Sequence, residues 1–87
     1  ADLWEASLQK ADLRGADLQW ADLRGANLQD ADLRRANLQG ADLRRADLRG
    51  ADFYLAELFK ADLRGAKITN SQIKDLIKNY FGIVIEE

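Results

Sequence analysis

The chain of 87 residues contains no cysteine, no histidine and no methionine. Without cysteine it has no disulfide framework and no thiolate zinc site. Without histidine it lacks the commonest general base and metal ligand of enzymes. Besides the two tyrosines, the side-chain hydroxyls are those of Ser7, Thr69 and Ser71, and none has the partners that a nucleophile requires. The sequence therefore predicts a protein that is not an enzyme and that holds no cofactor or metal.

A strong charge of one sign is also missing, because 13 basic side chains stand against 15 acidic ones and the formal net charge is −2. Such a balance creates no broad field to attract nucleic acid or a membrane surface. No apolar run approaches the roughly 20 residues of a membrane-spanning helix, and no signal-peptide pattern opens the chain. We expect neither nucleic-acid binding nor membrane insertion by this segment, which leaves the compartment open with the cytoplasm as the default.

The chain does have a repeat of five residues, which runs through fourteen consecutive units over residues 1–70. The first position is always alanine, and the third is leucine in twelve units, with Phe53 and Ile68 in the other two. The second position is aspartate nine times, and its exceptions are Ser7, Asn27, Asn37, Glu57 and Lys67. Because the repeat is already in register at Ala1 and no methionine precedes it, we expect the chain to be a piece of a longer protein.

A period of five fits neither regular element. On an α-helix a step of five residues turns by about 140°, so the leucines would spiral around every side. On a flat strand an odd step places successive leucines on opposite faces. The consistent solution is a short extended stretch with Ala and Leu inward, followed by a corner. Glycine at the fifth position of five units suits a corner, but Trp20 and Lys60 occupy the same position, so the corner does not require glycine.

The number of sides is suggested by the fourth position, which alternates between arginine and glutamine from Arg14 to Arg44. A ten-residue period is commensurate with a four-sided coil and not with a three-sided one. The consensus A-[DN]-L-x-x over residues 1–70 resembles the pentapeptide-repeat family. The resemblance implies an all-β solenoid, a right-handed quadrilateral parallel β-helix with twenty residues per coil and therefore about 3.5 coils. The best-understood members of that family are gyrase-protecting dimers that mimic DNA.

The repeat ends near residue 70, and a helical pattern follows it. Thr69 is a plausible N-cap with Gln72 as its capping-box partner, and Gly82 is a natural helix stop. One apolar face comprises Ile73, Leu76, Ile77, Tyr80 and Phe81. We therefore divide the chain into a pentapeptide-repeat solenoid, 1–70, and a C-terminal capping α-helix with a short strand, 71–87. The helix is expected to cover the open end of the solenoid, and a role in dimerisation is the alternative.

Four-sided stacking would place residues twenty apart above one another and so create columns of like side chains. Aspartates 2, 22, 42 and 62 form one such column, and arginines 24, 44 and 64 form another. A carboxylate column could attract a cation, and an arginine column could grip phosphates. We expect instead that the two kinds of column neutralise each other. Trp4 is predicted to make a cation–π contact with Arg24, one coil along.

Large apolar side chains at outward positions are the most suggestive candidates for binding. Tyr54, Leu55 and Phe59 interrupt an otherwise polar surface. Either the C-terminal segment folds against them, which we favour, or they form an exposed patch for a partner. The candidate interaction surface comprises Tyr54, Leu55, Phe59, Trp4, Trp20, Tyr80 and Phe81.

The predicted function is that of a non-catalytic structural or protein–protein interaction module, a domain of a larger protein. It would bind a protein partner as a monomer, or as a dimer through its solenoid ends. The alternative is a DNA mimic that acts on a topoisomerase as a dimer. That alternative needs a strongly acidic surface, whereas residues 1–66 carry 10 basic against 12 acidic side chains.

Overall fold

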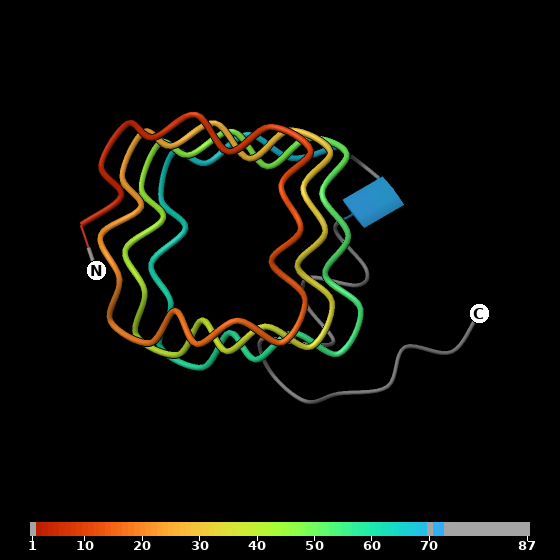
Figure 1. Cartoon of the computed structure of the whole chain (residues 1–87). Helices are drawn as coiled ribbons and strands as arrows, with labels where there is room; N and C mark the ends of the chain where they lie inside the picture. Colours follow the sequence, from red (N-terminus) through yellow and green to blue (C-terminus); the bar gives the residue numbers. More distant parts are fainter. Residues whose placement is uncertain (1, 70, 73–87) are drawn as a thin grey trace.

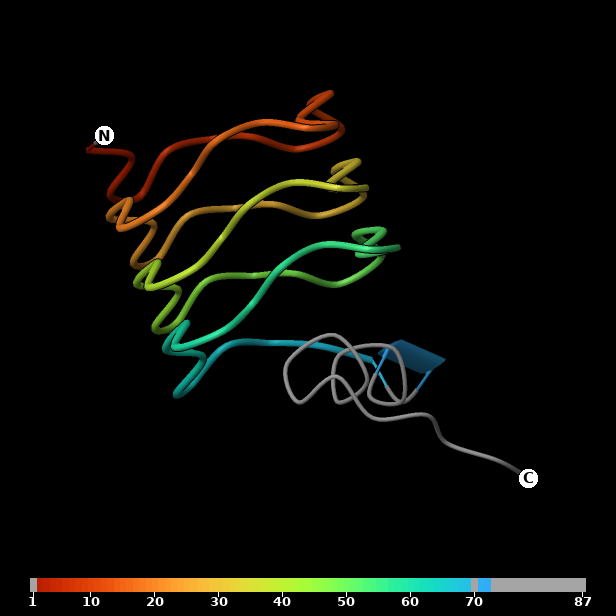
Figure 2. The same ribbon diagram turned by 90° about the horizontal axis from the view of Figure 1, so that it is seen from below.

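The chain winds into a four-sided coil whose turns stack along one axis (Figures 1 and 2). The computed structural model describes residues 2–69, 71 and 72. The second residue of each repeat unit forms a parallel bridge with the residue twenty positions later, from Asp2 with Asp22 to Asp47 with Lys67. Twenty residues are four units, so each unit makes one side of a coil. The prediction of four sides is confirmed.

Regular secondary structure is minimal in this architecture. Within the described residues every strand is a single-residue bridge, and in the units up to residue 65 a two-residue turn follows the bridge at the corner. Ser71 and Gln72 are helical. The remainder of the predicted C-terminal helix and strand, residues 73–87, lies outside the described residues.

The interior of the coil is a column of leucine and alanine, as the sequence predicted. Leucines in the middle coils, such as Leu23 and Leu43, are completely buried, and Phe53 fills the same kind of position with 3% exposure. Each buried leucine contributes roughly 1.5–3 kcal/mol to folding. Leu3 and Leu8 in the first described coil are only partly buried. Leu63 and Ile68 in the last described units are also partly buried, so the interior is fully enclosed only in the middle coils.

Backbone hydrogen bonds join the coils in a pattern that repeats with each unit. The second N–H donates to the preceding coil, the third and fifth N–H groups donate to the following coil, and the first N–H of the next unit closes the corner turn. In the unit 41–45 these bonds run from Asp42 N to Ala21 O (2.9 Å), Leu43 N to Asp62 O (2.8 Å), Arg45 N to Arg64 O (3.0 Å) and Ala46 N to Leu43 O (3.0 Å). Four of the five donors are thus satisfied by main-chain oxygens.

The fifth donor explains why aspartate dominates the second position. The N–H of the fourth residue donates to the side-chain oxygen of the second residue at 3.0–3.3 Å in all eleven units that have Asp or Asn there. Asn27 and Asn37 accept this bond as the aspartates do. The second position therefore favours a short side-chain acceptor, and the negative charge is a separate property.

Every described corner holds its fifth residue in the left-handed conformation. The φ angles range from 54° at Glu5 to 77° at Gly50, and eight corners carry a residue other than glycine. Trp20 and Leu55 are examples, at 61° and 59°. The sequence prediction that the corner tolerates other residues is confirmed, although each such residue costs on the order of 1 kcal/mol relative to a right-handed conformation.

One corner glycine is required for a second reason. A Cβ atom on Gly40 would lie 2.3 Å from Cε3 of Trp20, whose ring crosses the corner of the next coil. The absence of a side chain at Gly40 therefore allows Trp20 to lie against the main chain of the neighbouring coil.

Gln72 satisfies the backbone at the end of the solenoid. The last unit has Lys67 in its second position, which offers no acceptor, and Thr69 N donates instead to Gln72 Oε1 at 2.8 Å. Gln72 Nε2 donates to Leu48 O at 2.7 Å and to Ala51 O at 2.9 Å. The side chain is buried, with 8% exposure. The oxygen of Gln72 thus takes the place of the aspartate acceptor, and its nitrogen donates to main-chain oxygens as a following coil would.

The predicted capping box at this point forms only in part. Its glutamine half is present, because the N–H of Thr69 donates to the side chain of Gln72. Its threonine half is wrong, because Gln72 N donates to the main-chain oxygen of Thr69 at 3.0 Å. The Thr69 hydroxyl lies 3.1 Å from Gln72 Oε1 and donates to it. Gln72 Oε1 thus accepts two hydrogen bonds from Thr69, and the hydroxyl acts as a donor to the side chain of Gln72.

Candidate interaction surface

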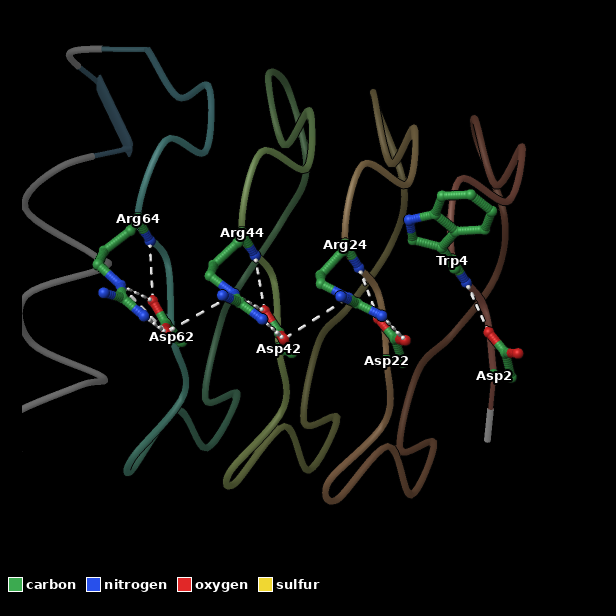
Figure 3. Close-up of polar contacts among 8 residues, drawn as sticks. All are labelled: Asp2, Trp4, Asp22, Arg24, Asp42, Arg44, Asp62 and Arg64. Atoms are coloured by element: carbon green, nitrogen blue, oxygen red, sulfur yellow. Dashed lines mark hydrogen bonds and ion pairs between the residues drawn. The ribbon is translucent and has the colours of Figure 1, made fainter.

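A ladder of aspartate and arginine runs along side A of the solenoid, which we define as residues 1–5, 21–25, 41–45 and 61–65. Figure 3 shows the column of Arg24, Arg44 and Arg64 beside the aspartate of each unit, with Trp4 in line at the first coil. Arg24 binds Asp22 through Nε to Oδ1 at 2.8 Å and Nη2 to Oδ2 at 2.7 Å. The same two-point contact recurs at Arg44 and Arg64. This planar pairing is the strongest geometry available to the two groups.

The ladder also connects successive coils. Arg24 Nε lies 3.8 Å from Asp42 Oδ2, and Arg44 Nε lies 3.9 Å from Asp62 Oδ2. Each of these carboxylates therefore sits between the guanidinium of its own unit and that of the preceding coil. A matching ladder with Arg14 occupies the side of residues 11–15. The prediction that the arginine and aspartate columns neutralise each other is confirmed.

These contacts hold the carboxylates in their ionised form. The hydrogen bonds from Arg24 lower the pKa of Asp22 to about 2, and those from Arg14 and Arg64 do the same for Asp12 and Asp62. A carboxylate with such a pKa is a poor general acid or base at neutral pH. Across residues 2–69, 71 and 72, no three Asp or Glu side chains are arranged to hold a metal ion.

The ladder predicts that the two roles of aspartate can be separated by mutation. We expect Asp42→Ala to lower the free energy of unfolding by about 1–3 kcal/mol, because Arg44 N then loses its acceptor in a half-buried setting. Asp42→Asn should cost less than half as much, since asparagine keeps the acceptor and the ion pair it gives up is partly solvated. Urea unfolding followed by circular dichroism measures both. Equal losses would show that charge, and not the main-chain hydrogen bond, determines the second position.

A groove of about 550 Å³ lies between the arginine column of side A and the corner column beside it. The corner column consists of Glu5, Gly25, Arg45 and Gly65, and its two glycines make the groove hollow. The side chains of the other two residues cross these glycines: Cγ of Glu5 lies 3.2 Å from where a Cβ of Gly25 would stand, and Cγ of Arg45 lies 3.3 Å from that of Gly65. Trp4, in line with the arginine column at the first coil (Figure 3), also lines the groove.

Arg45 is a residue that the sequence analysis overlooked. Within the described part of the chain its guanidinium makes no ion pair or side-chain hydrogen bond, and the same holds for Arg35. The signal was present in the sequence, because an arginine at the fifth position has leucine, not aspartate, two residues before it. The neutralised ladder therefore has an unneutralised cation at its edge.

The predicted apolar patch is exposed. Tyr54, Leu55 and Phe59 have exposed fractions of 60%, 50% and 59%, and they lie on two adjacent sides of the same coil. Trp4 and Trp20 are also exposed and belong to the first coil. Tyr80 and Phe81 lie outside the described residues, as does most of the C-terminal segment that was expected to fold against the patch.

Cation–π contacts differ from the prediction. Lys60 Nζ lies 5.5 Å from the centroid of the Phe59 ring, a contact the sequence analysis did not identify. The predicted contact of Trp4 with Arg24 is wrong, since no such contact occurs between these two described residues. The reason is that the guanidinium of Arg24 is turned toward Asp22.

Comparison with known proteins agrees with this geometry. The profile of the pentapeptide repeats matches residues 1–30 and 26–65. The chain belongs to the pentapeptide-repeat family. A solved pentapeptide-repeat protein, Rfr23 from the cyanobacterium Cyanothece 51142, is 39% identical over 76% of this chain and 42% of its own, with a TM-score of 0.55. The right-handed quadrilateral β-helix of the pentapeptide-repeat proteins is therefore the fold of this chain.

Two further pentapeptide-repeat structures show lower similarity. HetL, involved in heterocyst differentiation regulation in the cyanobacterium Nostoc sp. strain PCC 7120, is 36% identical over 76% of this chain and 44% of its own, with a TM-score of 0.41. QnrB1, a plasmid-mediated fluoroquinolone resistance protein, is 23% identical over 93% of this chain and 45% of its own, with a TM-score of 0.47. The chain spans less than half the length of each of these three proteins.

No curated protein matches this pentapeptide-repeat chain. As regards membranes, the described residues include no helix with the length and apolar character that a bilayer crossing requires.

Proposed function

We propose that this pentapeptide-repeat chain is a non-catalytic module that binds another protein, as one domain of a larger polypeptide. The observation that carries the proposal is the apolar patch of Tyr54, Leu55 and Phe59, three large exposed side chains on two adjacent sides of one coil. Contiguous exposed apolar side chains mark interaction sites, and aromatic residues contribute most to binding at such sites.

The use of the polar side chains supports the non-catalytic part of the proposal. Six aspartates are paired with the arginine of their own unit: Asp12, Asp22, Asp32, Asp42, Asp47 and Asp62. Each of them also accepts a main-chain N–H. Groups held in this way maintain the scaffold, and they are not available for proton transfer at neutral pH.

We further propose that the solenoid comprises about 3.5 coils over residues 1–70, with residues 71–87 as its C-terminal cap. The buried position of Gln72, which bonds to main-chain oxygens of Leu48 and Ala51, supports a cap that begins at this point. The proposed module is a monomer, or a dimer that associates through the ends of the solenoid.

The alternative of a DNA mimic has less support. A mimic needs rows of carboxylates that present uncompensated negative charge. Here the aspartate columns of two sides are interleaved with arginines, and each carboxylate from Asp22 to Asp62 in the ladder of side A is within 4 Å of a guanidinium. We therefore place this alternative second.

Site-specific photo-cross-linking tests the proposed function. A photoreactive phenylalanine replaces Phe59 in one protein and Gln9, an exposed residue of the first coil, in the other. Each protein is exposed to extract of the source cells. We expect a discrete adduct from position 59 that is absent at position 9, and its loss when Tyr54 is changed to Ser in the same protein.

The outcomes distinguish an interaction module from a dimer and from a patch that binds nothing. An adduct with a different protein supports the interaction module. An adduct whose mass equals two copies of this chain supports the dimer that the mimic alternative requires. Equal labelling at positions 59 and 9, or none at either, contradicts the proposal that the Tyr54–Phe59 patch is a binding surface.

A further inference from the structure

We propose that the groove of side A binds a short, extended, acidic peptide segment. This inference extends the proposed function to a second surface, because the groove lies on a different side from Tyr54, Leu55 and Phe59. It rests on Arg24, Arg44, Arg45 and Arg64, and none of these residues belongs to the apolar patch.

The walls of the groove are basic although the chain as a whole is not. Four arginines line it, against one acidic residue, Glu5. The residues that line it do not include the aspartates of the ladder. The charges of arginine and aspartate cancel over side A as a whole, but the residues that line the groove are mainly arginines. A ligand in the groove therefore contacts positive charge.

The arginines of the ladder retain unused donors. Arg24 and Arg44 engage their aspartates through Nε and Nη2. The third nitrogen, Nη1, makes no hydrogen bond within the described residues and carries two N–H groups. It lies on the edge of the guanidinium away from the aspartate, so a carboxylate in the groove can accept from it. Such charge-assisted hydrogen bonds are roughly twice as strong as neutral ones.

Arg45 supplies the strongest attraction. It has no anionic partner among the described residues, whereas its neighbour Arg44 is paired with Asp42. Its stem passes Gly65, with Cγ 3.3 Å from where a Cβ would stand, and the residue lines the groove. An anion that binds here gains a full ion pair without displacing an existing one.

The dimensions fit an extended peptide. Coils of a parallel β-structure lie about 4.8 Å apart, so the three steps from Trp4 to Arg64 span about 14 Å. An extended chain rises about 3.3 Å per residue, and four to five residues cover that length. Carboxylates on alternate residues face the same way at intervals of about 6.6 Å, so they can reach the arginine column without matching its spacing of about 4.8 Å one to one. The exposed ring of Trp4, with 58% exposure, provides an apolar contact at the other end.

The binding test uses a fluorescein-labelled, terminally blocked Glu-Val-Glu-Val-Glu peptide, followed by fluorescence anisotropy at low and moderate salt. The matched variants are Arg45→Gln and Arg35→Gln. Both arginines end an ADLRR unit, occupy a left-handed corner and lack an ion pair within the described residues. They lie on different sides, and Arg35 lines a separate hollow of about 470 Å³ with Arg14, Arg34 and Tyr54, so the comparison distinguishes the groove of side A from that hollow. We expect Arg45→Gln to weaken binding about tenfold and Arg35→Gln to change it less than about twofold. The peptide Gln-Val-Gln-Val-Gln should not bind.

Several results would overturn the proposal. One is the absence of binding by the acidic peptide at low salt. Another is an equal loss in both variants, which would indicate attraction by net charge alone. A loss confined to Arg35→Gln would place the site on another side. Tighter binding of a single-stranded oligothymidine that Arg45→Gln also abolishes would make the groove a nucleic-acid site. None of these results affects cross-linking at Phe59, so this inference and the proposed function fail independently.

Discussion

Leu43→Asp is expected to abolish cooperative folding of the solenoid, whereas Gln39→Asp is expected to leave it nearly unchanged. Leu43 is completely buried and lies in the interior between Leu23 and Leu63 of the adjacent coils. Its replacement removes roughly 1.5–3 kcal/mol of apolar burial. It also places a carboxylate where no arginine reaches, at a cost of several kcal/mol.

The predicted loss is comparable with the whole stability of a small domain, about 5–15 kcal/mol. Coils that contact only their neighbours cannot bypass a damaged one, so a defect in a central coil interrupts the stack in both directions. Gln39 projects outward and shares a hydrogen bond with Gln19 at 3.2 Å, which is exposed. Its replacement by aspartate adds the same charge at a cost below about 1 kcal/mol.

Circular dichroism and urea unfolding compare the two variants at the same protein concentration. A folded Leu43→Asp protein with a sharp transition would contradict the inward assignment of the third position. Equal destabilisation by the two variants would do so as well, since it would mean that added charge and not burial determines the result.

The interior and the four sides could be predicted because they follow from one repeated constraint. Alanine and leucine two positions apart share a face in any extended segment, and a period of five then forces a corner. Phe53 and Ile68 change the size of the inward side chain but not its direction, so the pattern survived these substitutions. Four sides of five residues place residues twenty apart above one another, and this predicted the columns that contain Asp42 and Arg44.

The two roles of the second position were harder to separate from sequence alone. Aspartate was interpreted as a charge that neutralises arginine, which is true at Asp42 but not at Asn37. The common role is acceptance of the fourth N–H, and it is visible only when every backbone donor is followed to its acceptor. The predicted contact between Trp4 and Arg24 failed for a related reason. Stacking order places the two side chains near each other, but it does not reveal that Arg24 turns toward Asp22 to form a hydrogen bond.

The groove could not be predicted because it depends on what is missing from two corners. Gly25 and Gly65 were interpreted as residues that ease a turn, yet non-glycine residues make the same turn at Glu5 and Arg45. Their effect on the surface arises because glycines alternate with long side chains along the corner column of Glu5, Gly25, Arg45 and Gly65. A long side chain lies across each following glycine, which leaves a basic hollow beside the ladder.

Gln72→Glu is expected to lower the free energy of unfolding by about 2–4 kcal/mol at neutral pH, although the two side chains have nearly the same shape. Gln72 Nε2 donates to Leu48 O and Ala51 O, and a carboxylate has no hydrogen to donate to either. Leu48 O keeps the N–H of Ala51 at 3.1 Å, whereas the buried oxygen of Ala51 loses its donor, which costs about 1–3 kcal/mol. The charge is also buried, and it faces two carbonyl oxygens instead of a cation.

The pH dependence of this variant follows from the same contacts. Burial next to carbonyl oxygens should raise the pKa of the introduced carboxyl group in the folded protein above its unfolded value of about 4.3. The protonated acid regains one hydrogen-bond donor. The loss of unfolding free energy relative to the unchanged protein should therefore be largest above the folded pKa and should shrink as the pH falls through it. Gln72→Leu, which introduces no titrating group, should show a deficit without this pH dependence.

Ser71→Glu is the matched control, because it adds the same charge one residue earlier on an exposed side chain. It should change stability by less than about 0.5 kcal/mol. Hydrogen exchange locates the effect: in Gln72→Glu the amides of Leu48 and Lys67, which join the last two coils, should exchange faster, while that of Leu28 should not. If Gln72→Glu and Ser71→Glu gave the same unfolding curve, the amide of Gln72 would not seal the end of the solenoid, and the cap would have to be held by residues further along the chain.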